Sequence, residues 1–132
     1  MIEIARDLVE EIVSHARAEY PNECCGLLAG EDGRAVRVYR MTNADASTAS
    51  YRLDPKEHLE VFDELEEKRW DLLAIYHSHT HSPAYPSETD RKLAFYPGSR
   101  YLIVSLAGGE APDLRAFRID DGEVAEEEVR VT

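Results

Sequence analysis

Short apolar runs, each bounded by polar or turn residues, constrain the fold of this chain more than any other feature of its sequence. Residues 24–29, 72–76 and 101–106 are runs of this kind, and their length suits buried strands rather than helices. Between them lie segments in which apolar residues recur at three- and four-residue steps, the pattern of a helix with one buried face. The alternation of the two patterns predicts an α/β domain with a central, mixed sheet flanked by helices.

Helices are expected in three places. Apolar residues share one face of the first segment, and Pro21 ends it. In the second segment Asp54 has the position of an N-cap, with Pro55 in the first turn. The first helix is expected at about residues 5–19, the second begins at 54–55, and the third is expected at about residues 87–95.

The remaining strands are expected in two hairpins. A turn at 30–33, rich in glycine, joins the first apolar run to a segment of alternating apolar and polar residues at 35–41. A second turn at 120–122 joins strands expected at 114–119 and 124–131. No linker or repeat divides the chain, so its 132 residues are expected to form one domain, 1–132.

The charge balance of the chain excludes several classes of partner. Fifteen Lys and Arg residues against 27 Asp and Glu residues give a net charge of −12. A nucleic-acid-binding protein needs a basic face, so nucleic acid is not expected as a partner of this chain. An anionic membrane surface is disfavoured for the same reason. No apolar run approaches the roughly 18 residues that span a bilayer.

The cysteine content and the N-terminal sequence favour the cytoplasm. Cys24 and Cys25 are adjacent, and adjacent cysteines rarely form a structural disulfide, so both are expected to be free thiols in a reducing compartment. The first residues lack the basic-then-apolar order of a secretory signal.

The segment that follows the second apolar run has the residue types of a metal site. His77, His79 and His81 lie within five residues, and residues i and i+2 of an extended chain point to the same side. His77 and His79 can therefore direct two imidazoles at one point. Asp90, in the first turn of the next expected helix, can supply a third ligand, and three protein ligands leave a position for water, as in catalytic zinc sites.

Each of these residues also has a structural interpretation. A His-x-His pair alone is a weak signal of metal binding. The Ser87-x-x-Asp90 sequence is close to a capping box, in which Asp90 needs no metal. Glu23, at the entry to the first apolar run, is the candidate base for a hydrolytic water, whereas most glutamates are ordinary solvated residues. Buried cysteines usually act as small apolar residues, so Cys24 and Cys25 are not expected to be nucleophiles.

The order of these residues resembles a known motif. Glu23, then His77-x-His79, then seven residues, then Ser87-x-x-Asp90, is similar to the full motif of the JAMM (MPN+) zinc metallopeptidases. Further segments resemble a bacterial subgroup, the sulfur-carrier-protein–cysteine peptidases of an alternative cysteine-biosynthesis route. These segments are 41–44, 51–54, 75–80, 84–87 and 117–122.

The resemblance implies a compact MPN domain with a mixed, curved sheet and one zinc ion per chain. Its implied zinc ligands are His77, His79 and Asp90. The family's general acid/base falls on Glu23, and the serine that helps to stabilise the tetrahedral oxyanion falls on Ser87. The implied partner is a ubiquitin-like sulfur-carrier protein whose C-terminal Gly-Gly bears a cysteine. Hydrolysis of that terminal amide releases cysteine and the carrier.

Three other functions are kept as alternatives. A non-catalytic MPN binding module would typically lack the ligand set. A non-haem iron oxygenase also uses two histidines and a carboxylate, but there the carboxylate usually lies between the histidines in sequence. An isopeptidase that removes a ubiquitin-like modifier from lysine would use the same chemistry.

His81 is expected to line the cleft or face solvent. The oligomeric state is left open, and a homodimer is one possibility.

Overall fold

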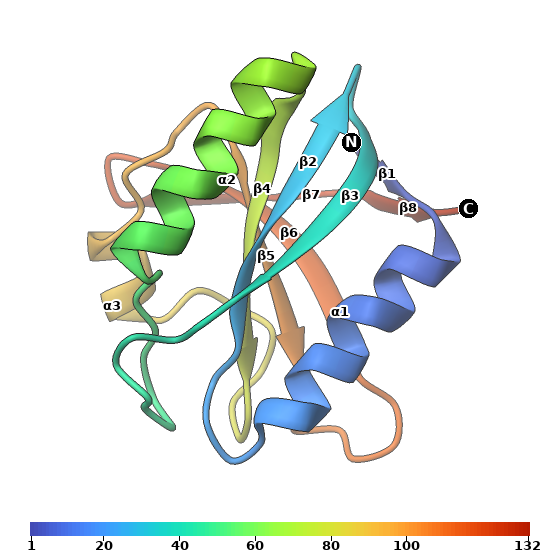
Figure 1. Cartoon of the computed structure of the whole chain (residues 1–132). Helices are drawn as coiled ribbons and strands as arrows, with labels where there is room; N and C mark the ends of the chain where they lie inside the picture. The colour runs from blue at the N-terminus through green and yellow to red at the C-terminus, as the bar shows by residue number, and fades with distance from the viewer.

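The three apolar runs form the middle of one eight-stranded sheet in the computed structural model, which describes all 132 residues (Figure 1). The sheet has the strand order β7-β6-β5-β4-β2-β3-β1-β8. The elements are β1 (Ile2–Ile4), α1 (Arg6–Glu19), β2 (Cys25–Glu31), β3 (Arg34–Met41), α2 (Pro55–Lys68), β4 (Asp71–His79), α3 (Glu88–Lys92), β5 (Arg100–Ser105), β6 (Asp113–Asp120), β7 (Glu123–Glu127) and β8 (Val129–Val131). None of the helices has both the length and the apolar character needed to cross a membrane.

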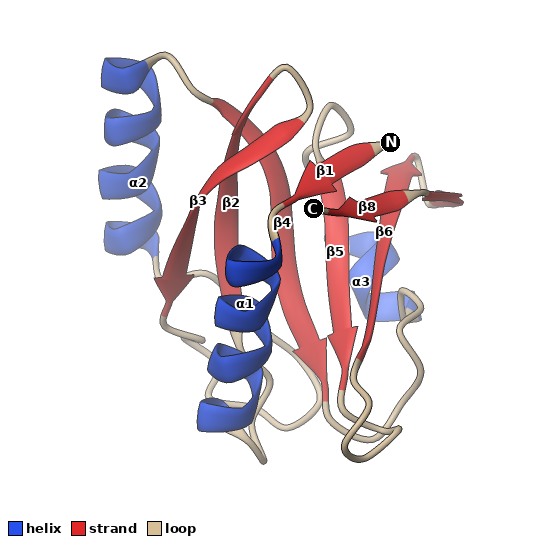
Figure 2. Ribbon diagram, turned by 90° about the vertical axis from the view of Figure 1, so that its right-hand side faces the viewer, coloured by secondary structure: helices blue, strands red, loops and turns tan.

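The sheet is mixed and strongly curved. Strand β4 is antiparallel to β2 and parallel to β5, and β1 is parallel to both β3 and β8. The two edge strands, β7 and β8, are consecutive in the chain and are separated only by Glu128. The amide of Ile2 donates a hydrogen bond of 3.1 Å to the Glu128 carbonyl, and β1 and β8 lie close to β6 in Figure 2. The sheet therefore curls toward a barrel, and the expected mixed, curved sheet is confirmed.

Apolar side chains on the two sides of the sheet form two separate cores. On one side, residues of α1 such as Ile12 pack with Leu28 of β2 and other buried apolar residues. On the other side, Leu65 of α2 packs in a cluster that includes Ile75 of β4. Because successive side chains of a strand point to opposite faces, one continuous apolar run serves both cores.

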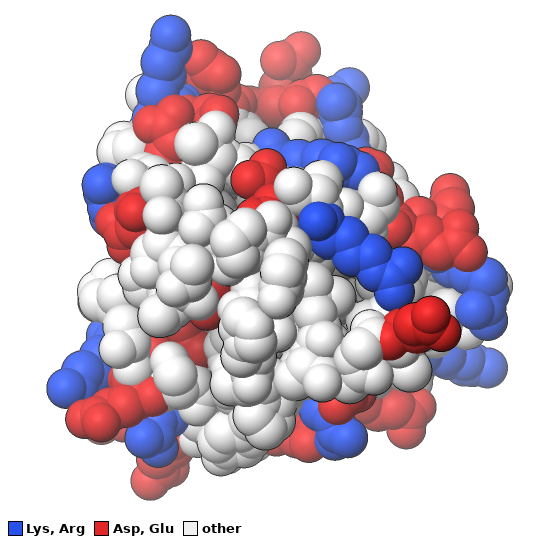
Figure 3. Space-filling model, turned by 90° about the horizontal axis from the view of Figure 1, so that it is seen from below, with Lys and Arg blue, Asp and Glu red and all other residues white.

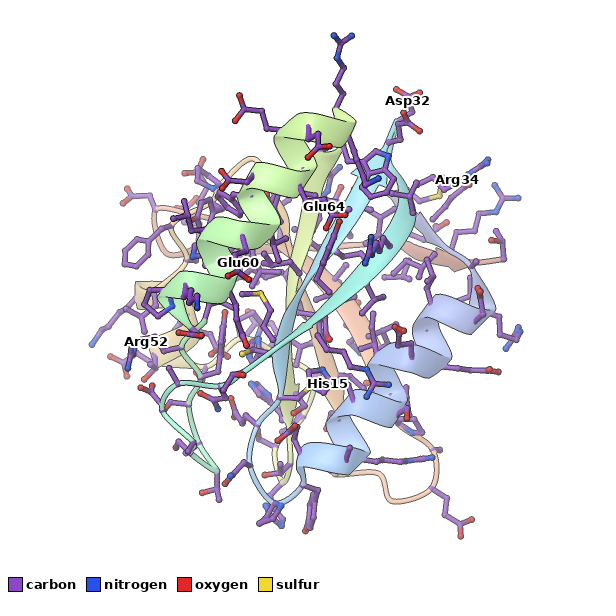
Figure 4. The ribbon with its side chains drawn as sticks, viewed as in Figure 1. His15, Asp32, Arg34, Arg52, Glu60 and Glu64 are labelled. Carbon is purple, nitrogen blue, oxygen red and sulfur yellow. The ribbon has the colours of Figure 1, made fainter.

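A buried polar contact joins α1 to the sheet. The Nδ1 atom of His15 lies 2.7 Å from the Tyr76 hydroxyl, and Figure 4 shows His15 on the side of α1 turned toward the strands. Burial lowers the pKa of His15, which favours the neutral ring. Gly26 pairs with Tyr76 across the β2–β4 ladder, and a Cβ atom at Gly26 would overlap the tyrosine ring. The absence of a side chain at this position leaves the space that Tyr76 fills.

The C-terminal strand differs from the expected one. The turn at 120–122 predicts a hairpin in which a single strand over 124–131 pairs with the strand before it. The structure divides it at Glu128: β7 pairs with β6, whereas β8 pairs with β1 at the other end of the sheet. Strand β1, which is three residues long, was not predicted. A local pattern identifies a strand but not its partner, and so short a segment has no periodicity of its own.

Two helix predictions also need correction. The third helix is expected to extend to about residue 95, whereas α3 ends at Lys92. The side chain of Asp54 occupies the N-cap position of α2 but makes no capping hydrogen bond. The proline that follows already removes one of the unpaired amides at this helix end.

A Gly26→Ala substitution should destabilise the protein by about 1–3 kcal/mol, the usual cost of overpacking a core. The added methyl group would displace the Tyr76 ring and its hydrogen bond to His15. Urea denaturation measures the effect. Gly98→Ala is the matched control, because a Cβ atom there meets nothing within 4 Å. Equal stabilities of the two variants would contradict this account of the α1–sheet contact.

Candidate active site

Strand β4 contains both histidines of the predicted metal pair. The apolar pattern predicts a strand that ends at Tyr76, whereas β4 continues to His79. Its neighbours hold this end on both sides, since His77 pairs with Cys25 of β2 and His79 pairs with Ser105 of β5. His77 and His79 are only 1% and 3% exposed. A strand in the middle of a sheet therefore directs both imidazoles to the same side.

Three side chains converge at this end of β4. The Nε2 atoms of His77 and His79 lie 3.2 Å apart, and the Oδ2 atom of Asp90 lies 3.1 Å from each of them. The Nδ1 atom of His79 lies 2.7 Å from the Pro83 carbonyl. Because a carbonyl only accepts, Nδ1 bears the proton and Nε2 directs a lone pair at the cluster, as in a metal-ligating histidine. Two imidazole nitrogens and one carboxylate oxygen are a ligand set that suits zinc.

Asp90 both caps the start of α3 and contributes an oxygen atom to the cluster. The amide of Asp90 donates to Ser87 Oγ at 3.0 Å, and the amide of Ser87 donates to Asp90 Oδ2 at 2.9 Å, which completes the capping box at the start of α3. Burial opposes ionisation of Asp90, but its contacts with the His77 and His79 rings and the hydrogen bond from the Ser87 amide hold its pKa below the usual range. The same oxygen thus caps the start of α3 and faces two histidines.

Glu23 is a buried acid rather than a solvated one. It lies two residues before the start of β2 and is 5% exposed, and its Oε1 atom has no hydrogen-bond partner. Burial raises the pKa of Glu23 to about 7; the charge of His79 opposes this shift and that of Asp90 adds to it. Glu23, His79 and Ser87 line one cleft of about 260 Å³. The structure therefore brings all five residues of the sequence motif to one place.

The backbone at Glu23 is held by residues that the sequence did not single out as functional. Its amide donates to the Ser47 carbonyl at 2.9 Å, and its carbonyl accepts from Asn43 Nδ2 at 3.0 Å. The amide of the next residue, Cys24, donates to Ser78 Oγ at 2.8 Å. The Oδ1 atom of Asn43 accepts from two backbone amides of its own loop. Asn43 thus couples the loop after β3 to the position of Glu23, a long-range contact with no local sequence signal.

Tyr51 is a second residue of the site that sequence reasoning missed. Its ring stacks on His77, with centroids 4.4 Å apart and planes inclined by 22°. Burial raises the pKa of Tyr51, which keeps the phenol neutral. Tyr51 lies in the segment 51–54, which resembles the bacterial subgroup, but nothing in the sequence pairs it with His77.

The cysteines and the third histidine lie outside the cluster. Cys24 and Cys25 are free and fully buried, and burial raises their pKa values to about 11 and about 12, so both are protonated at neutral pH. Neither is an activated nucleophile. His81 lines the cleft, with Nε2 3.1 Å from the Tyr20 hydroxyl and Nδ1 3.0 Å from Thr80 Oγ1.

Comparison with known proteins identifies similar sequences over nearly the whole chain. The CysO-cysteine peptidase of Mycobacterium tuberculosis is 47% identical, over 97% of this chain and 89% of its own. A probable TtuB-protein conjugate cleaving protease of Thermus thermophilus is 36% identical, over 91% of this chain and 77% of its own.

Solved structures share the fold. Protein DSY2949 of Desulfitobacterium hafniense is 40% identical and superimposes with a TM-score of 0.91, covering 100% of this chain and 93% of the other. The JAB1/MPN domain protein AF2198 of Archaeoglobus fulgidus, at 22% identity, superimposes with a TM-score of 0.67, covering 98% of each chain. The MPN fold expected from the motif is thereby confirmed.

The family follows from the extent of these matches. A sequence profile described as prokaryotic homologs of the JAB domain matches residues 5–120. Since this match covers most of the chain and the mycobacterial peptidase is 47% identical over nearly all of it, the chain belongs to the prokaryotic JAB-domain family.

Proposed function

We propose that this protein is a zinc-dependent peptidase that hydrolyses the amide bond after the C-terminal Gly-Gly of a ubiquitin-like sulfur-carrier protein and releases cysteine. One observation carries the proposal. His77, His79 and Asp90 present three ligand atoms within 4.8 Å of one another, and a buried, unpartnered carboxylate oxygen of Glu23 lies in the adjoining cleft. The similarity to a CysO-cysteine peptidase supports the substrate class.

The zinc ion would be held by His77, His79 and Asp90. When bound, it would supply a Lewis acid for the substrate carbonyl and a water whose pKa is lowered to roughly 7. Every other part of the reaction is assigned to side chains of this chain.

Glu23 moves the proton. Its unpartnered Oε1 accepts a proton from the attacking water and returns it to the nitrogen of the leaving amine. A carboxyl group whose pKa lies well above its ordinary value can both accept and release a proton near neutral pH.

Ser87 stabilises the charge that develops on the carbonyl oxygen. Its Oγ atom already accepts a hydrogen bond from the Asp90 amide, so its own hydroxyl proton is available to donate to substrate. One such donor is typically worth about 10²–10³ in rate.

The surface around the site suits an uncharged peptide tail. The C-terminal end of β4 and the start of β2 lie at the bottom of Figure 1, and the same face, viewed from below in Figure 3, is largely uncharged at its centre with charged side chains at its rim. A Gly-Gly tail has no side chains to match and permits close backbone approach. The tail would lie in the cleft as an added strand.

A second candidate function is cleavage of a ubiquitin-like modifier from the lysine of a protein conjugate. The similarity to a TtuB-protein conjugate cleaving protease favours it. The same side chains would perform the same chemistry, and only the leaving amine would differ.

Two wider expectations are retained as proposals. Residues 1–132 would form one domain, because β1 and β8 extend the sheet beyond the matched residues 5–120. A cytoplasmic location fits two free, buried cysteines.

Glu23→Gln should keep zinc and lose about 10²–10⁴-fold in turnover, because the amide cannot accept the proton of water. His77→Ala and Asp90→Ala should lose both zinc and turnover. The measurements are zinc content per chain and hydrolysis of a carrier–cysteine conjugate. A Glu23→Gln enzyme with near-normal turnover would remove Glu23 from the mechanism, and zinc-loaded protein without any hydrolase activity would favour a binding module.

In metal-free protein, Glu23→Gln should raise stability at pH 8 and have little effect near pH 4.5. The folded pKa of Glu23, about 7, exceeds its ordinary value of 4.5, so the folded state binds the proton more tightly. The stability linked to that proton is present below pH 4.5 and is lost as the pH rises through about 7. Urea denaturation of chelator-treated protein across this range measures the difference, and a difference independent of pH would contradict it.

Asn43→Asp should lower kcat by about 10- to 100-fold with zinc content unchanged, since small displacements of a catalytic group have effects of this size. The substitution keeps the acceptor oxygens but removes the amide group that donates to the Glu23 carbonyl. Asn22→Asp is the matched control, because it adds the same charge beside Glu23 where no side-chain hydrogen bond is lost. Equal kcat values for the two variants would refute a positioning role for Asn43.

A further inference from the structure

The catalytic cleft continues into a second cavity toward the end of α1. The cleft that contains Glu23 and His79 is also lined by Thr80 and His81, and these two residues line a neighbouring cavity of about 480 Å³. We call this second cavity the leaving-group pocket. Its lining residues are Arg17, Tyr20, Thr80, His81, Leu106, Ala107 and Gly109.

We propose that the leaving-group pocket receives the amino acid that is released, and that Arg17 binds its free α-carboxylate. The inference rests on the proposed function and refines its substrate class. It assigns a role to a pocket that the motif Glu23, His77-x-His79, Ser87-x-x-Asp90 does not include.

The position of Glu23 determines on which side the leaving group lies. The group that returns a proton to the leaving nitrogen must lie within hydrogen-bond reach of that nitrogen. Glu23 shares its cleft with Thr80 and His81, whereas the ring of His77 is covered by Tyr51. The substituent on the nitrogen therefore extends past Thr80 and His81 into the leaving-group pocket.

Arg17 is suited to bind a carboxylate there. It is the one Lys or Arg side chain among the residues that line the cleft and the pocket, and it forms no ion pair with a carboxylate of the protein. One N–H group, at Nη2, donates to the Glu110 carbonyl at 3.2 Å, which orients the guanidinium group. A guanidinium group has five N–H donors in a planar fork, so others are available for the two oxygens of a carboxylate.

A cation at this place also complements the charge of the chain and of the proposed ligand. The chain has a net charge of −12, and Glu23 and Asp90 are carboxylates of the adjoining site. Arg17 places a positive charge beside this site, which favours the entry of an α-carboxylate into an otherwise acidic protein. His81 forms part of the pocket wall, because its two ring nitrogens contact the Tyr20 and Thr80 hydroxyls.

The arrangement distinguishes the two candidate substrates. A cysteine added to the end of a carrier has a free α-carboxylate next to the scissile nitrogen. A lysine within a protein conjugate has none, because its own carboxyl group is part of a peptide bond. An arginine that binds the carboxylate therefore favours a terminal amino acid as leaving group over an isopeptide.

A kinetic cycle with two enzymes and two substrates tests the role of Arg17. The substrates are CysO–cysteine and CysO–cysteinamide, which differ only in the carboxylate, and the enzymes are the wild type and Arg17→Gln. The wild type should prefer the acid by about tenfold in kcat/KM, the effect of a charge-assisted hydrogen bond at a partly exposed site. Arg17→Gln should lower cleavage of the acid to the level of the amide and leave cleavage of the amide unchanged.

Arg6→Gln is the matched control, because Arg6 is exposed at the other end of α1 and has no ion pair. It should leave both rates unchanged. An Arg17→Gln enzyme that keeps the preference for the acid, or that loses both activities equally, would overturn the proposal while the peptidase function stands.

A binding measurement tests the pocket without catalysis. S-methyl-L-cysteine, which has no thiol to ligate metal, is titrated into metal-free protein, and amide chemical shifts are followed by NMR. Saturable shifts at Thr80 and Ala107 are expected in the wild type but not in Arg17→Gln, and the amide of the same ligand should not produce them. If these shifts occur while neither CysO conjugate is cleaved, the pocket assignment holds and the proposed function fails. If no saturable shift occurs, the pocket assignment is refuted.

Discussion

The arrangement of the site depends on the contacts that the Oδ2 atom of Asp90 makes with α3 and with β4. This atom accepts a hydrogen bond from the Ser87 amide, which starts α3, and it faces the Nε2 atoms of His77 and His79 on β4. One carboxylate oxygen therefore fixes where a short helix begins and how that helix lies against the sheet. A capping box and a metal ligand are usually considered as competing interpretations of such a residue, but here the same geometry satisfies both.

The site is also a place where the fold tolerates unfavourable burial. Glu23 is removed from water with an unpartnered oxygen, and the Nδ1 atom of His77 is buried without a partner. Such groups cost stability, which the surrounding structure must offset. Backbone hydrogen bonds on both sides of Glu23 and the ladders on both sides of β4 supply the rigidity that holds these groups in place. Unsatisfied polar groups of this kind are typical of functional sites rather than of cores.

Much of the sheet was predictable because the apolar runs of β2, β4 and β5 are contiguous and are bounded by turns. The split between β7 and β8 was not predicted: three consecutive glutamates at 126–128 interrupt the alternation of residues 124–131, but the change of partner at Glu128 depends on the closure of the sheet. Likewise, the helix period could not show that α3 ends at Lys92. In each case the local pattern is compatible with several tertiary arrangements.

The sequence by itself determined the residue types of the site and their order, because His-x-His on a strand places two side chains on one face and Ser-x-x-Asp specifies a helix start. Only the tertiary structure decided that Glu23 is buried, that Asn43 holds its backbone, that Tyr51 covers His77, and that Arg17 lies in the pocket beyond His81. These features join segments that are far apart in the chain. Burial and long-range contacts depend on how elements pack, and no periodicity within a single segment encodes them.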